Sequence, residues 1–196
     1  MNPRLDDLLN RIKVLEAELE QEVAARQSEL RFCIEDRRVR FEQEVLVRHR
    51  ALKVGLLRYL AGTSWRHLVT VPVIYAMILP LLLLDAGVSL YQALCFPFYR
   101  IAKVKRGKYF VFDREQLAYL NLIERINCGY CTYANGLVAY AREIVGRTEQ
   151  YWCPIKHLRR VVGSHRHQIR FADFGDADAY RQELAALRRA LARLEP

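Results

Sequence analysis

Four residues in the C-terminal half have the types and spacing of a metal site. Cys128 and Cys131 form a C-x2-C pair, and Cys153 and His157 form a C-x3-H pair that follows after 21 intervening residues. Three thiolates and one imidazole suit tetrahedral zinc, and a set of four protein ligands leaves no position for water, so this zinc would be structural. The sequence therefore predicts a Cys3His zinc site.

This site depends on the chain between its two pairs. Residues 132–150 have the pattern of a helix, and an unbroken helix of that length holds its ends roughly 28 Å apart. The two pairs can then share an ion only if the helix breaks at Asn135 and Gly136, or if two subunits contribute ligands. Both arrangements stay open at this point.

The same C-x2-C pair favours a second chemistry. At the N-terminus of a helix, Cys128 would face unpaired backbone amides and the helix dipole, which activate a thiol as a nucleophile. Cys128 and Cys131 would then be the catalytic pair of a thiol oxidoreductase or redox sensor, and Cys153 would not be needed. A third interpretation is plain packing, with both cysteines as small buried side chains.

The residues around this pair resemble a known active site. Residues 126–135 (INCGYCTYAN) resemble the all-helical alkylhydroperoxidase and carboxymuconolactone decarboxylase-like families, in which a His follows the CxxC on the next helix turn. The resemblance implies thiol redox activity. Asn135 stands where that His would be, so the proton relay of those families has no counterpart at this position.

The rest of the sequence favours few other chemistries. It contains none of the glycine-rich nucleotide-binding patterns and no G-x-S-x-G or H-E-x-x-H pattern. Five cysteines, an odd number, without a signal peptide indicate a reducing compartment. The net charge is +9, but much of it surrounds one apolar stretch, so we expect lipid phosphates rather than nucleic acid as its partner.

That apolar stretch has the composition of a membrane segment. Residues 68–99 contain one charged side chain, Asp85, and residues 68–84 contain none. A membrane span needs ~20 apolar residues, and Pro80, Asp85 and Gly87 interrupt this stretch. We therefore expect a short membrane hairpin that turns around Asp85 and Gly87, where the carboxylate can reach water or a partner.

Basic residues flank the apolar stretch on both sides, and the only acid between Glu44 and Asp113 is Asp85. They are Arg48, Arg50, Lys53, Arg58 and Arg66 before it, and Arg100, Lys103, Lys105, Arg106 and Lys108 after it. Positive flanks mark the cytoplasmic face and attract anionic lipids. We therefore expect anionic membrane lipids as partners, at the inner cell membrane, with the N- and C-terminal regions in the cytoplasm.

The N-terminal third is predicted to be one long helix, because no proline follows Pro3 and no glycine precedes Gly55. Its apolar residues repeat every eleven positions, which is 3.67 residues per turn and keeps them on one face. One such series is Leu8, Leu19, Leu30, Phe41 and Leu52. The rest of the chain is too short to cover this face, so we expect a homo-oligomer or a helical partner protein.

These patterns predict an all-α, membrane-associated protein in four parts. The parts are a coiled-coil-like helix over residues 1–62, a membrane hairpin over 63–106, a Cys/His helical region over 107–172 and an amphipathic helix over 173–196. We expect Asp113 to start a helix in the third part and Asp176 to open the helix of the fourth. The predicted function is non-enzymatic assembly or scaffolding at a membrane, with zinc as a structural cross-link on the cytoplasmic side. The alternative is a membrane-tethered thiol oxidoreductase or redox sensor.

Overall fold

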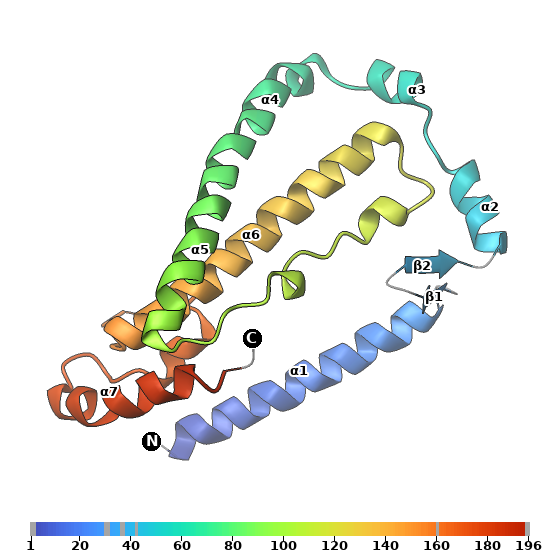
Figure 1. Cartoon of the computed structure of the whole chain (residues 1–196). Helices are drawn as coiled ribbons and strands as arrows, with labels where there is room; N and C mark the ends of the chain where they lie inside the picture. Colours follow the sequence, from blue (N-terminus) through green and yellow to red (C-terminus); the bar gives the residue numbers. More distant parts are fainter. Residues whose placement is uncertain (1–2, 30–31, 36–37, 42, 160, 195–196) are drawn as a thin grey trace. The chain divides into compact units, whose positions relative to one another are not determined.

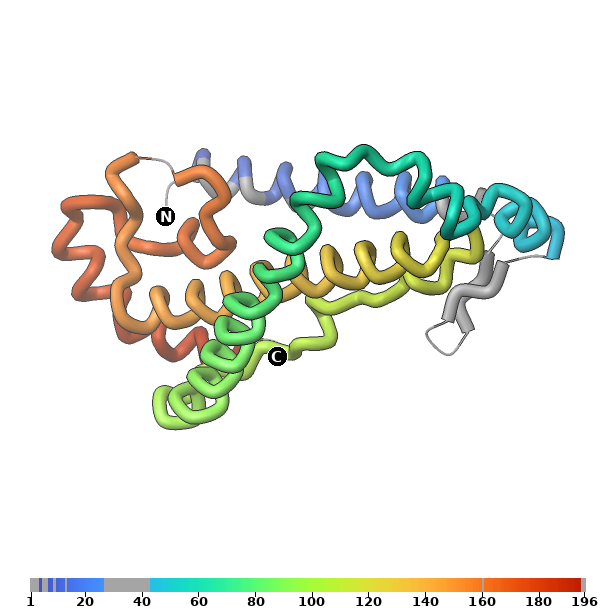
Figure 2. Tube along the Cα trace, turned by 90° about the horizontal axis from the view of Figure 1, so that it is seen from above, coloured from blue at the N-terminus to red at the C-terminus, as the bar shows by residue number. Residues whose placement is uncertain are grey.

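The structure, a computed structural model, describes residues 3–29, 32–35, 38–41, 43–159 and 161–194 (Figure 1). It is predominantly helical, as predicted, and Figure 2 shows the course of the chain from above. The described residues divide into two compact units. The first comprises Met1–Tyr59 and Asp113–Arg125, and the second comprises Leu60–Phe112 and Ile126–Pro196.

The first unit begins with helix α1, Pro3–Glu29. Strands β1 (Phe32–Glu35) and β2 (Arg38–Phe41) follow as an antiparallel pair, with Phe32 opposite Phe41. Helices α2 (Gln43–Ala51) and α3 (Leu56–Ala61) and the 3-10 turn η2 (Arg114–Gln116) come later in the chain.

The predicted single helix over residues 1–62 is therefore wrong, because α1 ends at Glu29. The strands lie where apolar residues alternate with charged ones and are β-branched or aromatic, as in Arg38, Val39, Arg40 and Phe41. That alternation with period two favours strand over helix. Leu30, a member of the eleven-residue series, lies outside the described residues.

The apolar series does continue over the length of α1. Its side chains are between 45% and 65% exposed at Leu8, Ile12, Leu15, Leu19 and Val23. The spacing of three and four residues places these five on one face of the helix. We call this set the α1 stripe.

In the second unit, helices α4 (Trp65–Ala76) and α5 (Ile78–Tyr99) follow each other directly, joined at Met77. The predicted turn at Asp85 and Gly87 is wrong, because both residues lie inside α5. One glycine inside a helix costs only about 1 kcal/mol, which the packing of a long helix readily offsets. The turn was also expected because the Asp85 carboxylate needs water or a partner, and α5 itself places Asp85 next to a partner, described below.

Helix α6 (Leu122–Trp152) is a single helix of 31 residues. Asn121 and Glu124 cap its start reciprocally: the Glu124 amide donates to Asn121 Oδ1 at 3.0 Å, and the Asn121 amide donates to Glu124 Oε2 at 2.8 Å. The helix does not break at Asn135 and Gly136, so the first of the two arrangements left open for the zinc site does not occur. Gly136 is buried there, and its missing side chain lets the Tyr109 carbonyl approach the helix.

The core of the second unit lies between α5, the segment that follows it, and α6. Its buried residues are Phe96, Ile101, Val104, Leu137, Tyr140, Ile144 and Leu191. Leu191 belongs to α7 (Ala177–Leu191), which Asp176 caps by accepting the Ala179 amide, as the sequence predicted. The 3-10 turns η1 (Arg106–Lys108) and η3 (Arg166–Arg170) complete the unit.

Candidate functional site

The two halves of the predicted zinc site lie at opposite ends of α6. Cys128 and Cys131 lie near its start, and the Cys153 amide still donates to the Glu149 carbonyl at 2.8 Å, which extends the helix by one residue. The 22 residues from Cys131 to Cys153 then span ~33 Å. A Cys3His site within one chain is therefore wrong, and zinc shared between two chains stays a prediction.

The burial of the four predicted zinc ligands also gives no sign of a shared site. His157 is exposed, as are Cys131 and Cys153, and Cys128 is half-buried. No group of three or more His, Cys, Asp or Glu residues that could hold a metal occurs within the described ranges.

The expected activation of Cys128 also fails. The helix begins at Leu122, so Cys128 lies nearly two turns inside it and its amide is not among the unpaired ones. The Asn135 side chain donates to the Cys131 carbonyl at 2.8 Å. Thiol redox chemistry at Cys128 and Cys131 stays a prediction, without the helix dipole as its cause.

One helix in the described part of the chain is long and apolar enough to cross a membrane. It is Trp65–Tyr99, formed by α4 and α5 together, with 35 residues and a mean hydropathy of 2.2 in its most apolar window. None of that window is buried, which distinguishes this helix from the central helix of a soluble core. This finding is consistent with the predicted membrane association of the apolar stretch.

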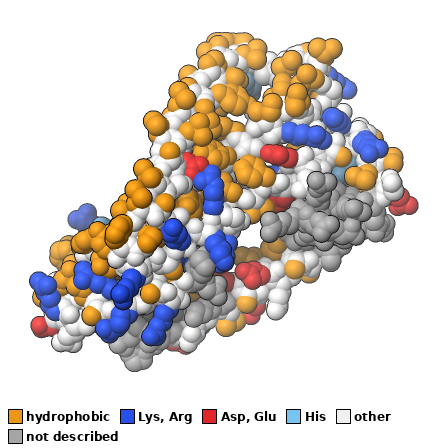
Figure 3. All heavy atoms as spheres, viewed as in Figure 1, with side chains coloured by type: hydrophobic (Ala, Val, Ile, Leu, Met, Phe, Trp, Pro, Cys, Tyr) orange, Lys and Arg blue, Asp and Glu red, His pale blue; other side chains and the backbone are white. Residues whose placement is uncertain are grey.

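The uncovered face of this helix is apolar from end to end, and hydrophobic side chains follow α4 and α5 in Figure 3. Residues four to seven positions apart are between 53% and 85% exposed along it: Trp65, Val69, Val73, Met77, Leu83, Leu90, Leu94 and Phe98. We call this set the outer stripe. It contains no charged residue.

The opposite face of the same helix carries its polar residues. Tyr75 Oη donates to Asn127 Oδ1 at 2.5 Å, near the start of α6. Further along, Gln92 Nε2 donates to Tyr140 Oη at 2.7 Å, and the Val104 amide donates to Gln92 Oε1 at 2.5 Å. The protein itself therefore provides hydrogen-bond partners for Tyr75 and Gln92 on this face.

Asp85 lies on this inner face and has three partners. Arg106 pairs with both of its carboxylate oxygens, with Nη2 and Oδ2 at 2.6 Å. Tyr133 Oη donates to Oδ2 at 2.8 Å, and Ser89 Oγ donates to Oδ1 at 3.3 Å. The Arg106 guanidinium also lies 4.1 Å from the centre of the Phe110 ring, a cation–π geometry.

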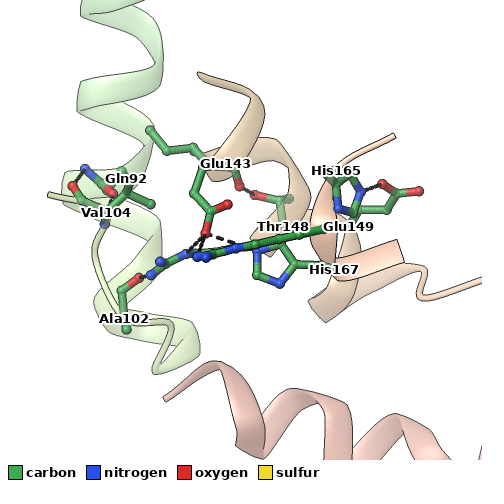
Figure 4. A network of polar contacts seen from close by, with 11 residues as sticks. Gln92, Ala102, Val104, Glu143, Thr148, Glu149, His165 and His167 are labelled. Carbon is green, nitrogen blue, oxygen red and sulfur yellow. Dashed lines mark hydrogen bonds and ion pairs between the residues drawn. The ribbon is translucent and has the colours of Figure 1, made fainter. Parts of the chain in front are cut away.

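A second polar cluster is buried at the far end of α6 (Figure 4). Glu143 Oε1 accepts hydrogen bonds from Arg147 Nε at 2.9 Å and Arg166 Nη2 at 2.9 Å, and lies 3.1 Å from His167 Nε2. Arg147 also donates from Nη1 to the Ala102 carbonyl at 2.5 Å. The cluster joins α6, η3 and the segment after α5.

The charge of Glu143 is stabilised by its neighbours. Burial raises the pKa of its carboxyl, but the hydrogen bonds from His167 and Arg147 outweigh burial and hold this pKa far below its ordinary value of 4.5. Sequence reasoning missed this cluster. The i,i+4 spacing of Glu143 and Arg147 was the available signal, but that spacing is common on solvated helix faces.

Comparisons with protein-family models, curated proteins and solved structures found no match to this chain.

Proposed function

We propose that the protein is a non-enzymatic assembly protein held at a membrane by α4 and α5. The observation that carries this proposal is the outer stripe, an apolar face about 50 Å long that no other described part of the second unit covers. An exposed apolar face of this size needs lipid or another protein. Lipid is favoured because basic residues bracket the stripe, and Asp85, the only acid between Glu44 and Asp113, lies on the opposite face of the helix.

The charge distribution supports an anionic surface as the binding site. Arg66 lies at the start of the helix, and Arg100, Lys103, Lys105 and Lys108 follow its end, all of them exposed. Each basic residue near an anionic bilayer contributes about 1 kcal/mol to binding. The same excess of positive charge favours the cytoplasmic face of the inner cell membrane, with the terminal regions in the cytoplasm.

Assembly is assigned to the α1 stripe. Its residues repeat with the spacing of a coiled-coil seam over Leu8, Ile12, Leu15 and Leu19, and they are exposed along a helix of 27 residues. A second copy of the chain offers a matching stripe. If zinc takes part, it joins two copies, because α6 separates the two ligand pairs within one.

Flotation with lipid vesicles tests the membrane proposal. The purified protein is mixed with vesicles of neutral phosphatidylcholine, with or without anionic phosphatidylglycerol, and floated through a density gradient. We expect flotation with anionic vesicles that persists in about 1 M salt, because apolar burial is not screened by ions.

A matched pair of variants locates the contact. Replacing Val73, Leu83 and Leu90 with Asp places three charges on the outer stripe and should abolish flotation. The control replaces Leu158, Val162 and Phe174 with Asp, since these side chains are more than 60% exposed, as are the three in the stripe, but lie outside the helix. Equal loss of flotation in both variants, or release of the native protein by salt alone, contradicts the proposal.

A further inference from the structure

The two faces of the helix formed by α4 and α5 differ along its length. The outer stripe is apolar and exposed, whereas the inner face hydrogen-bonds to the protein at Tyr75, Asp85 and Gln92. Two sets of residues give this helix its high mean hydropathy: the outer stripe, and apolar residues on the inner face. Of the inner residues, Phe96 belongs to the core, and Leu81 and Val88 pack against it. Hydropathy alone therefore overstates how much of this helix faces lipid.

Helices α5 and α6 run in the same direction, which constrains the chain between them. Tyr130 Oη, early in α6, donates to the Ile74 carbonyl at 2.9 Å, and Tyr140, ten residues later, meets Gln92. A parallel pair of helices requires the connecting chain to return along their length. In Figure 1 this return is the irregular segment after α5.

The return segment, residues 100–112, runs back beside α5. Val104 pairs with Gln92, and Arg106 pairs with Asp85, seven residues earlier in the helix. The segment is irregular apart from η1, and its five cations are Arg100, Lys103, Lys105, Arg106 and Lys108. Irregular backbone that is exposed to lipid is not tolerated in the hydrocarbon core of a bilayer, and charged side chains are costly there. Lys103, Lys105 and Lys108 of this segment are exposed. The part of α5 beside this segment therefore does not cross that core.

The length of the helix supports the same conclusion. Thirty-five residues extend over about 52 Å, whereas the hydrocarbon core is ~30 Å thick and spanning helices tilt by ~20° on average. Basic residues at both ends also place both ends on one side of a membrane.

From these observations we infer that α4 and α5 lie in the plane of the membrane, with the outer stripe in one leaflet. The inference rests on the proposed membrane anchoring and assigns its geometry. The return segment and α6 lie on the aqueous side, so Asp85 and Arg106 stay out of the hydrocarbon. This arrangement keeps both basic flanks on the same face without the hairpin turn that the structure lacks.

Depth measurements at three positions of the outer stripe test the inference. Tryptophan is introduced at Val69, Leu83 or Phe98 in the full-length chain, with the native Trp65 and Trp152 replaced by Phe. The variants bind vesicles that contain phosphatidylglycerol and lipids brominated at a shallow or a deep acyl position. Because an in-plane helix lies ~5–10 Å into the boundary, the three should be quenched within about twofold of one another, most strongly by the shallow bromines.

A control variant, Val145→Trp, reports on the aqueous side. Val145 is exposed on α6 between Arg142 and Glu149, which lie one turn away on the same face, and it should not be quenched. Deep quenching at Leu83 with shallow quenching at the two ends shows a span and overturns the in-plane inference while leaving the anchoring intact.

Two further outcomes also overturn the inference. Vesicle-bound protein without quenching at any position means that a second copy or another part of the chain covers the outer stripe. Protein that does not bind the vesicles at all contradicts the proposed function itself.

Discussion

Arg106 binds both carboxylate oxygens of Asp85, 21 residues back along the chain. The pair links the middle of the apolar helix to the segment that returns beside it. The Asp85 side chain is 13% exposed and that of Arg106 is 44% exposed, so the pair lies at the edge of the core, where water still reaches the guanidinium. An acid inside an apolar stretch is thereby held on the protein side of the helix.

Replacing Arg106 with Gln should lower the free energy of unfolding by ~1–2 kcal/mol, less than the loss for a fully buried pair because water screens the guanidinium. The measurement is thermal unfolding in detergent, followed by circular dichroism. The double variant Asp85→Asn with Arg106→Gln should recover part of the loss, because no unpaired carboxylate remains.

A neighbouring cation provides the control for this prediction. Lys103 is exposed, and Lys103→Gln removes the same charge without touching Asp85. We expect it to leave the unfolding temperature unchanged. Equal effects of the Lys103 and Arg106 variants would mean that net charge, and not the pair, stabilises the return segment.

The features that the sequence predicted correctly are local ones. Asp176 and the leucines that follow it mark α7, and a run of apolar residues marks α4 and α5. The errors involve partners far away in the chain. Gly136 continues α6 because Tyr109 packs against it, and Asp85 stays helical because Arg106 reaches it. Neither contact leaves a local pattern that sequence reasoning can read.

The prediction of a zinc site within one chain failed for a related reason. The cysteine spacing alone is compatible with zinc. The site is excluded because the helix between Cys131 and Cys153 is unbroken. The unbroken helix depends on the packing of Gly136 and on the cap at Asn121. Sequence reasoning missed this cap, because it placed the helix start at Asp113. The Glu143 cluster joins Glu143 to His167, 24 positions later, and Arg147 to Ala102, 45 positions earlier, and it has no motif of its own.

Gly136→Ala should destabilise the second unit by about 1–3 kcal/mol, because the new Cβ would lie 2.6 Å from the Tyr109 carbonyl oxygen and backbone has to move. Gly87→Ala is the matched control. It has no atom within 4 Å of the added Cβ, so better helix propensity should stabilise α5 by about 0.5–1 kcal/mol. Urea unfolding of both variants measures the difference, and the same sign in both would contradict the packing at Gly136.

Ile12→Ser with Leu19→Ser should reduce the oligomer size, because both residues belong to the α1 stripe. Val14→Ser is the control: Val14 is 56% exposed, but it lies on the other side of the helix. Light scattering in detergent measures the mass of each variant. If the double variant keeps the native mass, another surface mediates assembly or the protein is a monomer.

Cys153→Ser and Cys128→Ser should both leave the helical content and unfolding temperature of the monomer unchanged, since α6 keeps these residues apart. Removal of metal by a chelator should also leave the helical content and the unfolding temperature of the monomer unchanged. The measurement is metal content by mass spectrometry on anaerobically purified protein, together with circular dichroism. Stoichiometric zinc that disappears in both variants along with the dimer would establish the two-chain site.

Glu143 should make the stability of the second unit sensitive to acid. Its folded-state pKa lies far below the ordinary value of 4.5, so the unfolded chain takes up a proton first as the pH falls. The stabilisation is present above that ordinary value and should decline as the pH falls below about 5 towards the folded-state pKa. Urea unfolding midpoints between about pH 7 and pH 3 measure this slope.

Two variants separate the contribution of Glu143 from that of other acids. Glu143→Gln leaves the buried Arg147, 1% exposed, without its ion pair, and should cost ~3–5 kcal/mol at neutral pH while flattening the acid slope. Arg166→Gln removes only the exposed partner of Glu143, so it should cost about 1 kcal/mol or less and keep the protein folded for the titration. The control Glu183→Gln alters an exposed carboxylate on α7 and should preserve the native slope. If Glu143→Gln folds and retains the native acid slope, the pH dependence originates in other carboxylates and the cluster does not couple stability to pH.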